Sequence, residues 1–287
     1  MRSLQSGAAA FAALFLAGSA LSAQDAVPAD SLGWRRQIVG QLNLSQVSFD
    51  NWAQGGENSL SWQLVGAGRF RYQQPRYRWE SSFDLGYGKA KLGDSGTRKS
   101  SDEIRLESVL AYRSGAALDP YAAVSLQTQF ARGYRYDNGV AVAISDFMDP
   151  GYLTQSVGLS WKPSETFTTR LGGAFKETFT RDFPAYADDK STTAVEKTRV
   201  ERGVNSVTEL NAEVAHNVLL ASKLELFSNL DAFNAIDVNW ISSVTAKVSS
   251  YINVNLNVRV LYDRDVSVAR QLTEALALGL SYTLLLD

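Results

Sequence analysis

The stretch NSLSWQLVGAGRFRY, residues 58–72, is the clearest indication of the fold in this chain. Its alternate residues divide into an apolar set, Leu60, Trp62, Leu64, Gly66, Gly68, Phe70 and Tyr72, and a more polar set, Ser59, Ser61, Gln63, Val65, Ala67, Arg69 and Arg71. Successive side chains of a β-strand point to opposite faces, so this pattern predicts a strand with one apolar and one polar face. Trp62 and Tyr72 would lie roughly 25 Å apart in height on a tilted strand, about the height of the apolar band of an outer-membrane barrel. A half-buried strand of a soluble sandwich would show the same alternation, so one strand does not distinguish the two folds.

The alternation recurs along the chain and predicts about twelve strands, joined by connections that are alternately short and long. Short connections are expected near residues 74, 116, 163, 217 and 250, and longer ones near 54, 97, 142, 192 and 267, with a modest one near 234. Single-chain outer-membrane barrels have an even strand number, short periplasmic turns and longer outer loops. We therefore predict an all-β fold, a transmembrane antiparallel up-and-down β-barrel of about 12 strands. In the first strand the apolar positions change phase after Leu44, which predicts a β-bulge near Ser45 and Gln46.

Aromatic residues give a second indication of a membrane barrel. One set falls at strand ends beside the longer connections: Trp62, Tyr87, Phe130, Phe179, Trp240 and Tyr262. A second set falls beside the short turns or near the C-terminus: Tyr72, Tyr77, Trp79, Tyr112, Trp161, Phe167 and Tyr282. Amphipathic rings concentrate at the two membrane interfaces, whereas aromatic residues of an ordinary core would not be sorted to both strand ends. The sorting predicts an aromatic girdle at each rim.

The N-terminal residues predict export from the cytoplasm. Residues 1–23 are predicted to be a cleaved signal peptide, with Arg2 as its basic part, an apolar run over residues 8–20, and Ala23 before the cut. A membrane anchor is the alternative, but the apolar run is shorter than the roughly 20 residues of a spanning helix. Residues 24–33 form a predicted periplasmic leader, and residues 34–287 the barrel. No later apolar run reaches about 18 residues, so any membrane role is expected to come from strands.

Composition narrows the classes of partner and chemistry. The chain has no cysteine, which excludes disulfides, thiol catalysis and a lipidated cysteine. Its formal net charge is −2, which gives no electrostatic case for binding nucleic acid. The expected partners are outer-membrane lipid, the outer-membrane assembly machinery and a small polar solute. No cofactor is expected, and the sequence does not indicate an oligomeric state.

Charged residues are dense on the polar faces of three consecutive predicted strands. This predicted lumen charge cluster consists of Arg69, Arg71, Arg78, Glu80, Asp84, Glu103, Arg105 and Glu107. Opposite charges on neighbouring strands can form cross-strand pairs. Two interpretations follow: a lumen packed and held by salt bridges, or a charged constriction that selects solutes.

The distribution of catalytic residue types argues against an enzyme. The only histidine, His216, falls at a predicted short turn, whereas an outer-membrane phospholipase or a barrel protease would need a histidine near the outer rim. The predicted loops carry Asp146, Asp149, Asp182, Asp188 and Asp189. Loop carboxylates are usually solvated charges, and weak calcium binding is the alternative.

The stretch NLSQVSFDNWAQGGENSLSW, residues 43–62, is the most specific motif in the chain. The residues of this predicted motif loop that we single out are Gln46, Asn51, Trp52, Gly55, Gly56, Asn58 and Ser59. The two glycines supply a turn that can adopt positive φ at little energetic cost, and the asparagines can bond free backbone groups. Trp52 is expected to pack on the barrel rim or in its mouth, and binding of a solute by Trp52 is the alternative.

This motif and the alternating strands that follow resemble an outer-membrane barrel family of Gram-negative bacteria known as domain of unknown function 3078. The resemblance extends from about Trp34 over nearly the whole mature chain. It implies a barrel in the outer membrane and no assigned activity. The sequence departs from many outer-membrane barrels at its end, because Leu286 and Asp287 stand where an aromatic residue is common.

The function predicted from the sequence is that of a non-enzymatic outer-membrane barrel, a channel or porin-like protein for small polar solutes. The first alternative is a structural or binding barrel with a plugged lumen that presents its outer loops to a partner. A distant alternative is an outer-membrane hydrolase.

Overall fold

The computed structural model describes residues 32–50, 56–189, 192–231, 236–264 and 269–286. The predicted signal peptide, residues 1–23, lies outside these residues, and so does the leader up to residue 31. Among the described residues, no helix is long and apolar enough to cross a membrane.

Fourteen strands and one short 3-10 helix make up the regular secondary structure of the described chain. The strands are β1 (Gly33–Val47), β2 (Ser59–Gln73), β3 (Tyr77–Leu92), β4 (Thr97–Tyr112), β5 (Asp119–Thr128), β6 (Gly133–Asp137), β7 (Val140–Ser145), β8 (Gly151–Trp161), β9 (Phe167–Phe179), β10 (Thr198–Ala215), β11 (Val218–Asn229), β12 (Ile236–Lys247), β13 (Ile252–Tyr262) and β14 (Gln271–Leu286). The helix η1 spans Pro184–Tyr186.

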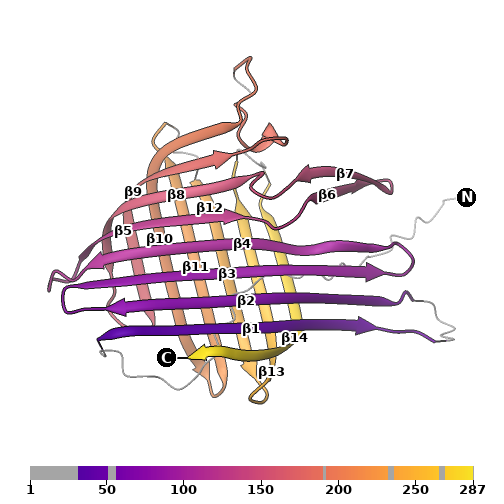
Figure 1. The fold of residues 1–287 in the computed structure, drawn as a ribbon, viewed down its shortest axis with the longest axis horizontal. Coiled ribbons are helices and arrows are strands. Elements are labelled where there is room, and N and C mark those ends of the chain that lie inside the picture. Colours follow the sequence, from indigo (N-terminus) through magenta and orange to yellow (C-terminus); the bar gives the residue numbers. More distant parts are fainter. Residues whose placement is uncertain (1–31, 51–55, 190–191, 232–235, 265–268, 287) are drawn as a thin grey trace, which may run out of the picture.

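Twelve of these strands form a closed antiparallel barrel, as predicted. Around the ring each strand pairs with the strand before and after it in the chain, with β8 following β5, and β1 pairs with β14 to close the barrel. Figure 1 shows β1 to β5 crossing in front of β10 to β13, with β14 beside β1. Each backbone polar group of the barrel wall therefore has a neighbouring strand to bond, which lets a sheet without edges cross a membrane.

The alternation places polar side chains inside the barrel and apolar side chains outside. On β2, Gln63 is 0% exposed in the interior, whereas its neighbour Leu64 is 54% exposed on the outer surface. On β13, Leu256 is 42% exposed and Asn255 only 4%. This is the reverse of a water-soluble domain, and it matches a barrel whose outer surface contacts lipid.

Two connections and one predicted β-bulge differ from the sequence-based expectation. The turn between β3 and β4 comprises only residues 93–96, because both strands continue through the segment expected to be a loop near residue 97. The connection from β5 to β8 contains the two-stranded hairpin β6–β7, which extends beyond the barrel in Figure 1. The predicted bulge near Ser45 and Gln46 is wrong: β1 pairs with β2 without interruption up to Val47, and its irregularity lies against β14 at Ile38 and Val39. The apolar positions change phase after Leu44 because β1 ends at Val47, beyond which the alternation of a strand no longer applies.

Aromatic rings contact one another near the short turns. The Trp34 ring centroid lies 4.9 Å from that of Tyr72 and 5.8 Å from that of Trp79. At the opposite end of β2, the Trp62 and Tyr87 centroids lie 6.1 Å apart. Whether these rings mark membrane interfaces stays a prediction.

Candidate functional site in the barrel lumen

The eight residues of the predicted lumen charge cluster all project from inward-facing positions, but they divide into separate groups. Arg71, Arg78 and Glu80 lie together near the short turns. Arg69 and Asp84 line a small cavity further along the lumen. The remaining residues, Glu103, Arg105 and Glu107, join a larger network at mid-height.

That network, here called the charged partition, consists of Glu103, Arg105, Glu107, Arg170, Glu209, Lys223, Glu225 and Arg259. Glu107 accepts hydrogen bonds from Arg170 Nη2 and Lys223 Nζ, each at 2.6 Å. Glu103 accepts from Arg105 Nη2 at 2.9 Å and from Arg259 Nη1 at 3.1 Å. Charge-assisted bonds of this length are strong, and together they offset the loss of hydration of the buried ions.

The partition joins opposite sides of the lumen. Around the twelve-strand ring, β4, which carries Glu107, stands five places from β11, which carries Lys223. Glu103 on β4 and Arg259 on β13 are also five places apart, where six would be diametrically opposite. The predicted pairing of neighbouring strands occurs between Arg71 and Glu80, whereas the long side chains of the partition also meet across the interior. The ion pairs therefore obstruct the lumen at mid-height.

Cavities lie on both sides of the charged partition. The loop-side cavity has a volume of about 340 Å³ and extends toward the long connections, where Tyr186 and Asp263 line it. The turn-side cavity, of about 40 Å³, is lined by residues that include Arg69, Asp84 and Asn211. Arg105, Glu107 and Lys223 line both cavities. Only side chains separate the two spaces at these positions.

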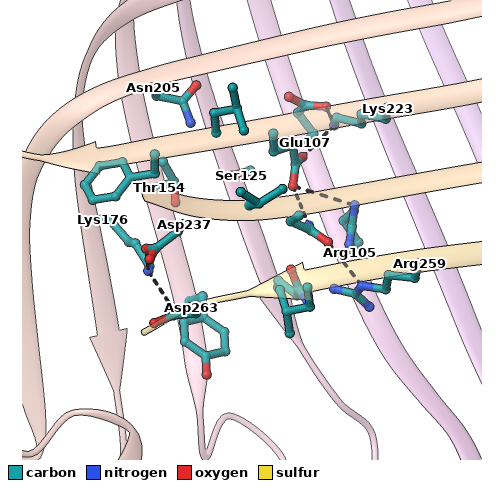
Figure 2. Close-up of a pocket in the computed structure, with 18 of the residues that line it drawn as sticks. Arg105, Glu107, Ser125, Thr154, Lys176, Asn205, Lys223, Asp237, Arg259 and Asp263 are labelled. Carbon is teal, nitrogen blue, oxygen red and sulfur yellow. Dashed lines mark hydrogen bonds and ion pairs between the residues drawn. The ribbon is translucent and has the colours of Figure 1, made fainter. Parts of the chain in front are cut away.

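A second ion group lies on the loop side of the charged partition. Lys176 Nζ lies 2.6 Å from Asp237 Oδ2, 3.2 Å from Asp263 Oδ2 and 3.7 Å from Glu201 Oε2. Figure 2 shows Lys176, Asp237 and Asp263 together at one end of the loop-side cavity. None of these residues was a predicted site residue, and the same holds for Arg170, Glu209, Lys223, Glu225 and Arg259. Their position on the polar face of each strand was the only available signal.

A third ion group closes the turn side. Arg71 contacts Glu80 on the neighbouring strand at 2.6 Å and reaches Glu165 in the β8–β9 turn at 3.5 Å. Lys162 Nζ donates to Glu165 Oε2 at 2.8 Å. Burial opposes ionisation of Glu165, but the hydrogen bond and charge of Lys162, with the charge of Arg71, outweigh it and hold the pKa of this carboxyl below its ordinary value.

Neutral side chains line part of the lumen wall near the first and last strands. The lumenal amide cluster consists of Gln41, Asn43, Gln63, Asn253, Asn255 and Asn257, all buried. Asn43 Nδ2 donates to Gln63 Oε1 at 3.0 Å, and Gln63 Nε2 donates to Ser101 Oγ at 2.9 Å. Gly279 on β14 leaves room for the cluster, because a Cβ there would lie 2.5 Å from Asn253 Oδ1 and 2.7 Å from Asn43 Oδ1.

The described part of the motif loop has a structural role. Asn58 Oδ1 accepts a hydrogen bond from the Phe49 backbone at 2.7 Å. Gly56 has φ +148°, and a Cβ there would lie 2.6 Å from the Phe49 ring, so only glycine fits. Gln46 lies near the end of β1 and Ser59 begins β2. Asn51, Trp52 and Gly55 lie outside the described residues, so the role expected for Trp52 stays a prediction.

Carboxylates hold the long connections over the loop side of the barrel. Asp149 is buried and accepts backbone hydrogen bonds from Arg181 at 2.9 Å and Asp182 at 2.7 Å. This bond pair precedes the helix η1, whose Tyr186 lines the loop-side cavity. Asp149 therefore positions the segment that carries Tyr186.

The other predicted chemical groups lie apart from the lumen site. His216 occupies the short turn between β10 and β11. Asp146 is paired with Arg132 at 2.8 Å, Asp182 with Arg181 at 3.0 Å, and Asp188 accepts a bond from the Glu196 backbone. Within the described ranges, no group of three or more histidine or acidic side chains is arranged to hold a metal ion.

Fold and lumen together define a single-chain antiparallel barrel of the outer-membrane type. The family model described as Protein of unknown function (DUF3078) matches residues 44–134. This match contains the whole motif loop and confirms the family resemblance there, although it is shorter than the near-complete coverage expected from the motif. A search of curated proteins found no match.

Several solved structures have similar strand arrangements. An outer membrane channel from Pseudomonas putida F1 is 16% identical, and the alignment covers 90% of this chain and 99% of that one with a TM-score of 0.41. The translocator domain of the autotransporter NalP from Neisseria meningitidis is 10% identical, with 89% and 90% coverage and a TM-score of 0.39. The KdgM porin is 10% identical, with 85% and 98% coverage and a TM-score of 0.33.

Proposed function

We propose that this protein is a non-enzymatic outer-membrane channel for small polar solutes, in which the charged partition forms the constriction. The observation that carries the proposal is that Arg105, Glu107 and Lys223 line the cavities on both sides of the partition. A solute that displaced these side chains would pass from one cavity into the other. Lysine and arginine stems have several rotatable bonds, so such a displacement requires no change in the backbone.

The location follows from the two faces of the barrel. Its outer surface carries apolar side chains such as Leu64 and Leu256, and its interior carries the ions. A barrel of this kind needs lipid around it and, in bacteria, lies in the outer membrane. Outer-membrane lipid and the assembly machinery are therefore the partners we propose besides the solute.

The alternative is a barrel whose lumen stays closed. The ion pairs at mid-height and at the turn side favour it, because each of these groups contains pairs of 2.6 Å that hold the interior. On that view the outer connections, including the β6–β7 hairpin, would bind a partner. The side chains that line both cavities favour the channel, because no backbone separates the two spaces there.

Conductance in a planar bilayer distinguishes these two functions. We expect the purified wild-type protein to show a small, stepwise ion conductance. The variant Glu107→Ala/Lys223→Ala shortens two partition side chains and removes one charge of each sign, so conductance should rise several-fold.

The matched control is Arg135→Ala/Asp137→Ala, which removes an ion pair of 2.9 Å from the β6–β7 hairpin outside the barrel. Its conductance should equal that of the wild type. If the wild type and the partition variant are both impermeable while folded, the closed-lumen alternative replaces the channel.

A further inference from the structure

The charges of the side chains that line the loop-side cavity sum to zero. The lining contains four cations and four anions: Arg105, Lys176, Lys223 and Arg259, and Glu107, Glu225, Asp237 and Asp263. Each of them forms an ion pair, as Lys176 does with Asp237 and Arg259 does with Glu103. A charged solute would have to break such a pair or remain without a counter-ion of its own, and both are unfavourable. The cavity is therefore unsuited to a solute with net charge.

Four neutral polar side chains on the same wall remain available. Ser125, Gln127, Thr154 and Asn205 line the cavity, and none of their side chains has a hydrogen-bond partner among the described residues. Asn205 is only 9% exposed as a whole residue, and it lines this space. These four groups border the open cavity, where water or a ligand would pair them. Hydroxyl and amide groups both donate and accept hydrogen bonds.

The strand register places two of these groups between the ion clusters. Glu107 is opposite Ser125, Ser125 is opposite Thr154, and Thr154 is opposite Lys176, in one row across β4, β5, β8 and β9. Figure 2 shows Ser125 between the partition residues and the Lys176 group. A ligand that bonded both hydroxyls would therefore lie directly on the loop side of the charged partition.

Aromatic rings complete the lining. Tyr152, Tyr186 and Phe227 border the cavity, and Lys176 Nζ lies 5.5 Å from the centroid of the Phe227 ring. Burial and the charge of Asp149 raise the pKa of Tyr186, which keeps its hydroxyl protonated as a hydrogen-bond donor. Flat aromatic faces beside separate donors and acceptors suit a ring that has apolar faces and polar edges.

From these features we infer that the loop-side cavity is a binding site for a neutral polyhydroxylated solute, a sugar of one or two rings. The volume of about 340 Å³ lies at the lower end of the range for small-molecule sites. This inference rests on the proposed channel function, in which the site would hold the solute before it crosses the partition. The inference names the class of substrate that the channel would take. Its main support is the set of hydroxyl and amide side chains in the cavity that have no hydrogen-bond partner in the described part of the chain.

Calorimetric titration of the full-length protein in detergent tests the inference independently of permeation. The probes are glucose, maltose and sucrose, with glucuronate and glucosamine as charged counterparts. We expect saturable binding of at least one neutral sugar and weaker binding of both charged ones. The variant Ser125→Ala/Thr154→Val removes two hydroxyls at nearly constant volume and should weaken sugar binding by about tenfold.

The control is Ser82→Ala, which removes a hydroxyl that lines the turn-side cavity, beyond the partition. Sugar binding by this variant should equal that of the wild type. No heat with any neutral sugar, or tighter binding of a charged probe, would overturn the inference even if the protein conducts ions. Sugar binding by a barrel that does not conduct would support the site and refute the channel.

Discussion

The lumenal amide cluster and the charged partition fill the same barrel by different means. The amide cluster bonds neighbouring strands, as Asn43 on β1 bonds Gln63 on β2. The partition bonds distant ones, as Glu107 on β4 bonds Lys223 on β11. Short neutral side chains line one wall, and long charged side chains reach over the interior from the other.

The amide cluster reinforces the wall of the barrel, whereas the charged partition obstructs its lumen. Hydrogen bonds between amide side chains on adjacent strands reinforce the wall and do not depend on the ion pairs across the interior. Ion pairs across the interior can exchange partners, because each carboxylate of the partition has two cations within reach. Any change in the width of the lumen is therefore expected on the charged side.

The largest expected effect comes from Gly279→Val on the amide side. The new side chain would overlap Asn253, Asn43 and Gln41, so we expect a loss of about 3 kcal/mol or more and little folded barrel. The migration of the unheated protein on a denaturing gel reports the folded form. Gly173→Val is the control, because nothing lies within 4 Å of a Cβ there. Normal folding of both variants would show that the amide cluster is loosely packed.

A smaller effect tests the outer face behind the amide cluster. Leu256 lies on β13 between the inward-facing Asn255 and Asn257. Leu256→Arg places a charge in lipid and should destabilise the barrel by about 2–4 kcal/mol. Thr154→Arg, which faces the loop-side cavity, should cost less. Unfolding by urea in lipid vesicles measures both, and equal losses would mean that the faces are misassigned.

The partition itself should respond to the number of charges removed. Glu107→Gln leaves Lys223 and Arg170 without their shared carboxylate, and we expect a loss of about 2 kcal/mol. Adding Lys223→Gln should restore part of this stability, since fewer unpaired ions then remain. Urea unfolding of both single variants and the double variant gives the coupling energy. Strict additivity would remove the pairing that we assign across the lumen.

The smallest effect concerns acid stability at the turn side. The pKa of Glu165 lies below its ordinary value of 4.5, so its pairing with Lys162 stabilises the folded protein fully above that pH. The contribution is lost as the pH falls through the lower pKa of the folded state. Glu165→Gln should therefore flatten the fall in stability below about pH 4.5. Thermal unfolding from pH 3 to 7 measures it, with Glu213→Gln, near the end of β10, as the control.

The strands and their faces were predictable because alternation is a local property. The polar face of residues 58–72 contains Gln63 and Arg69, and both side chains face the barrel interior from β2. The closed twelve-strand barrel followed from counting such segments and their connections. The hairpin β6–β7 was not anticipated, because its strands are only five and six residues long within a connection.

The composition of the charged partition was not predictable from spacing. Glu107 and Lys223 are 116 residues apart in the chain, and their contact depends on the width of the barrel and the positions of β4 and β11 around it. The sequence showed that each residue belongs to a polar face but not which faces meet. Gly56 illustrates the reverse case: its positive φ was anticipated from the turn, whereas its contact with Phe49 was not.

The neutral wall has a consequence for assembly of the barrel. The strands that meet last in chain order, β1 and β14, join beside the amide cluster, so the sealing step brings together amides and small residues such as Ala277. Closing so long a segment of chain is the entropically demanding step of such a topology. Amides carry no net charge, so the approaching ends lose less strongly bound hydration than ions would and need no ionic counterpart. The seam irregularity at Ile38 and Val39 shifts the pairing with β14 by one residue, the arrangement of a β-bulge, so the junction bends locally where the barrel closes.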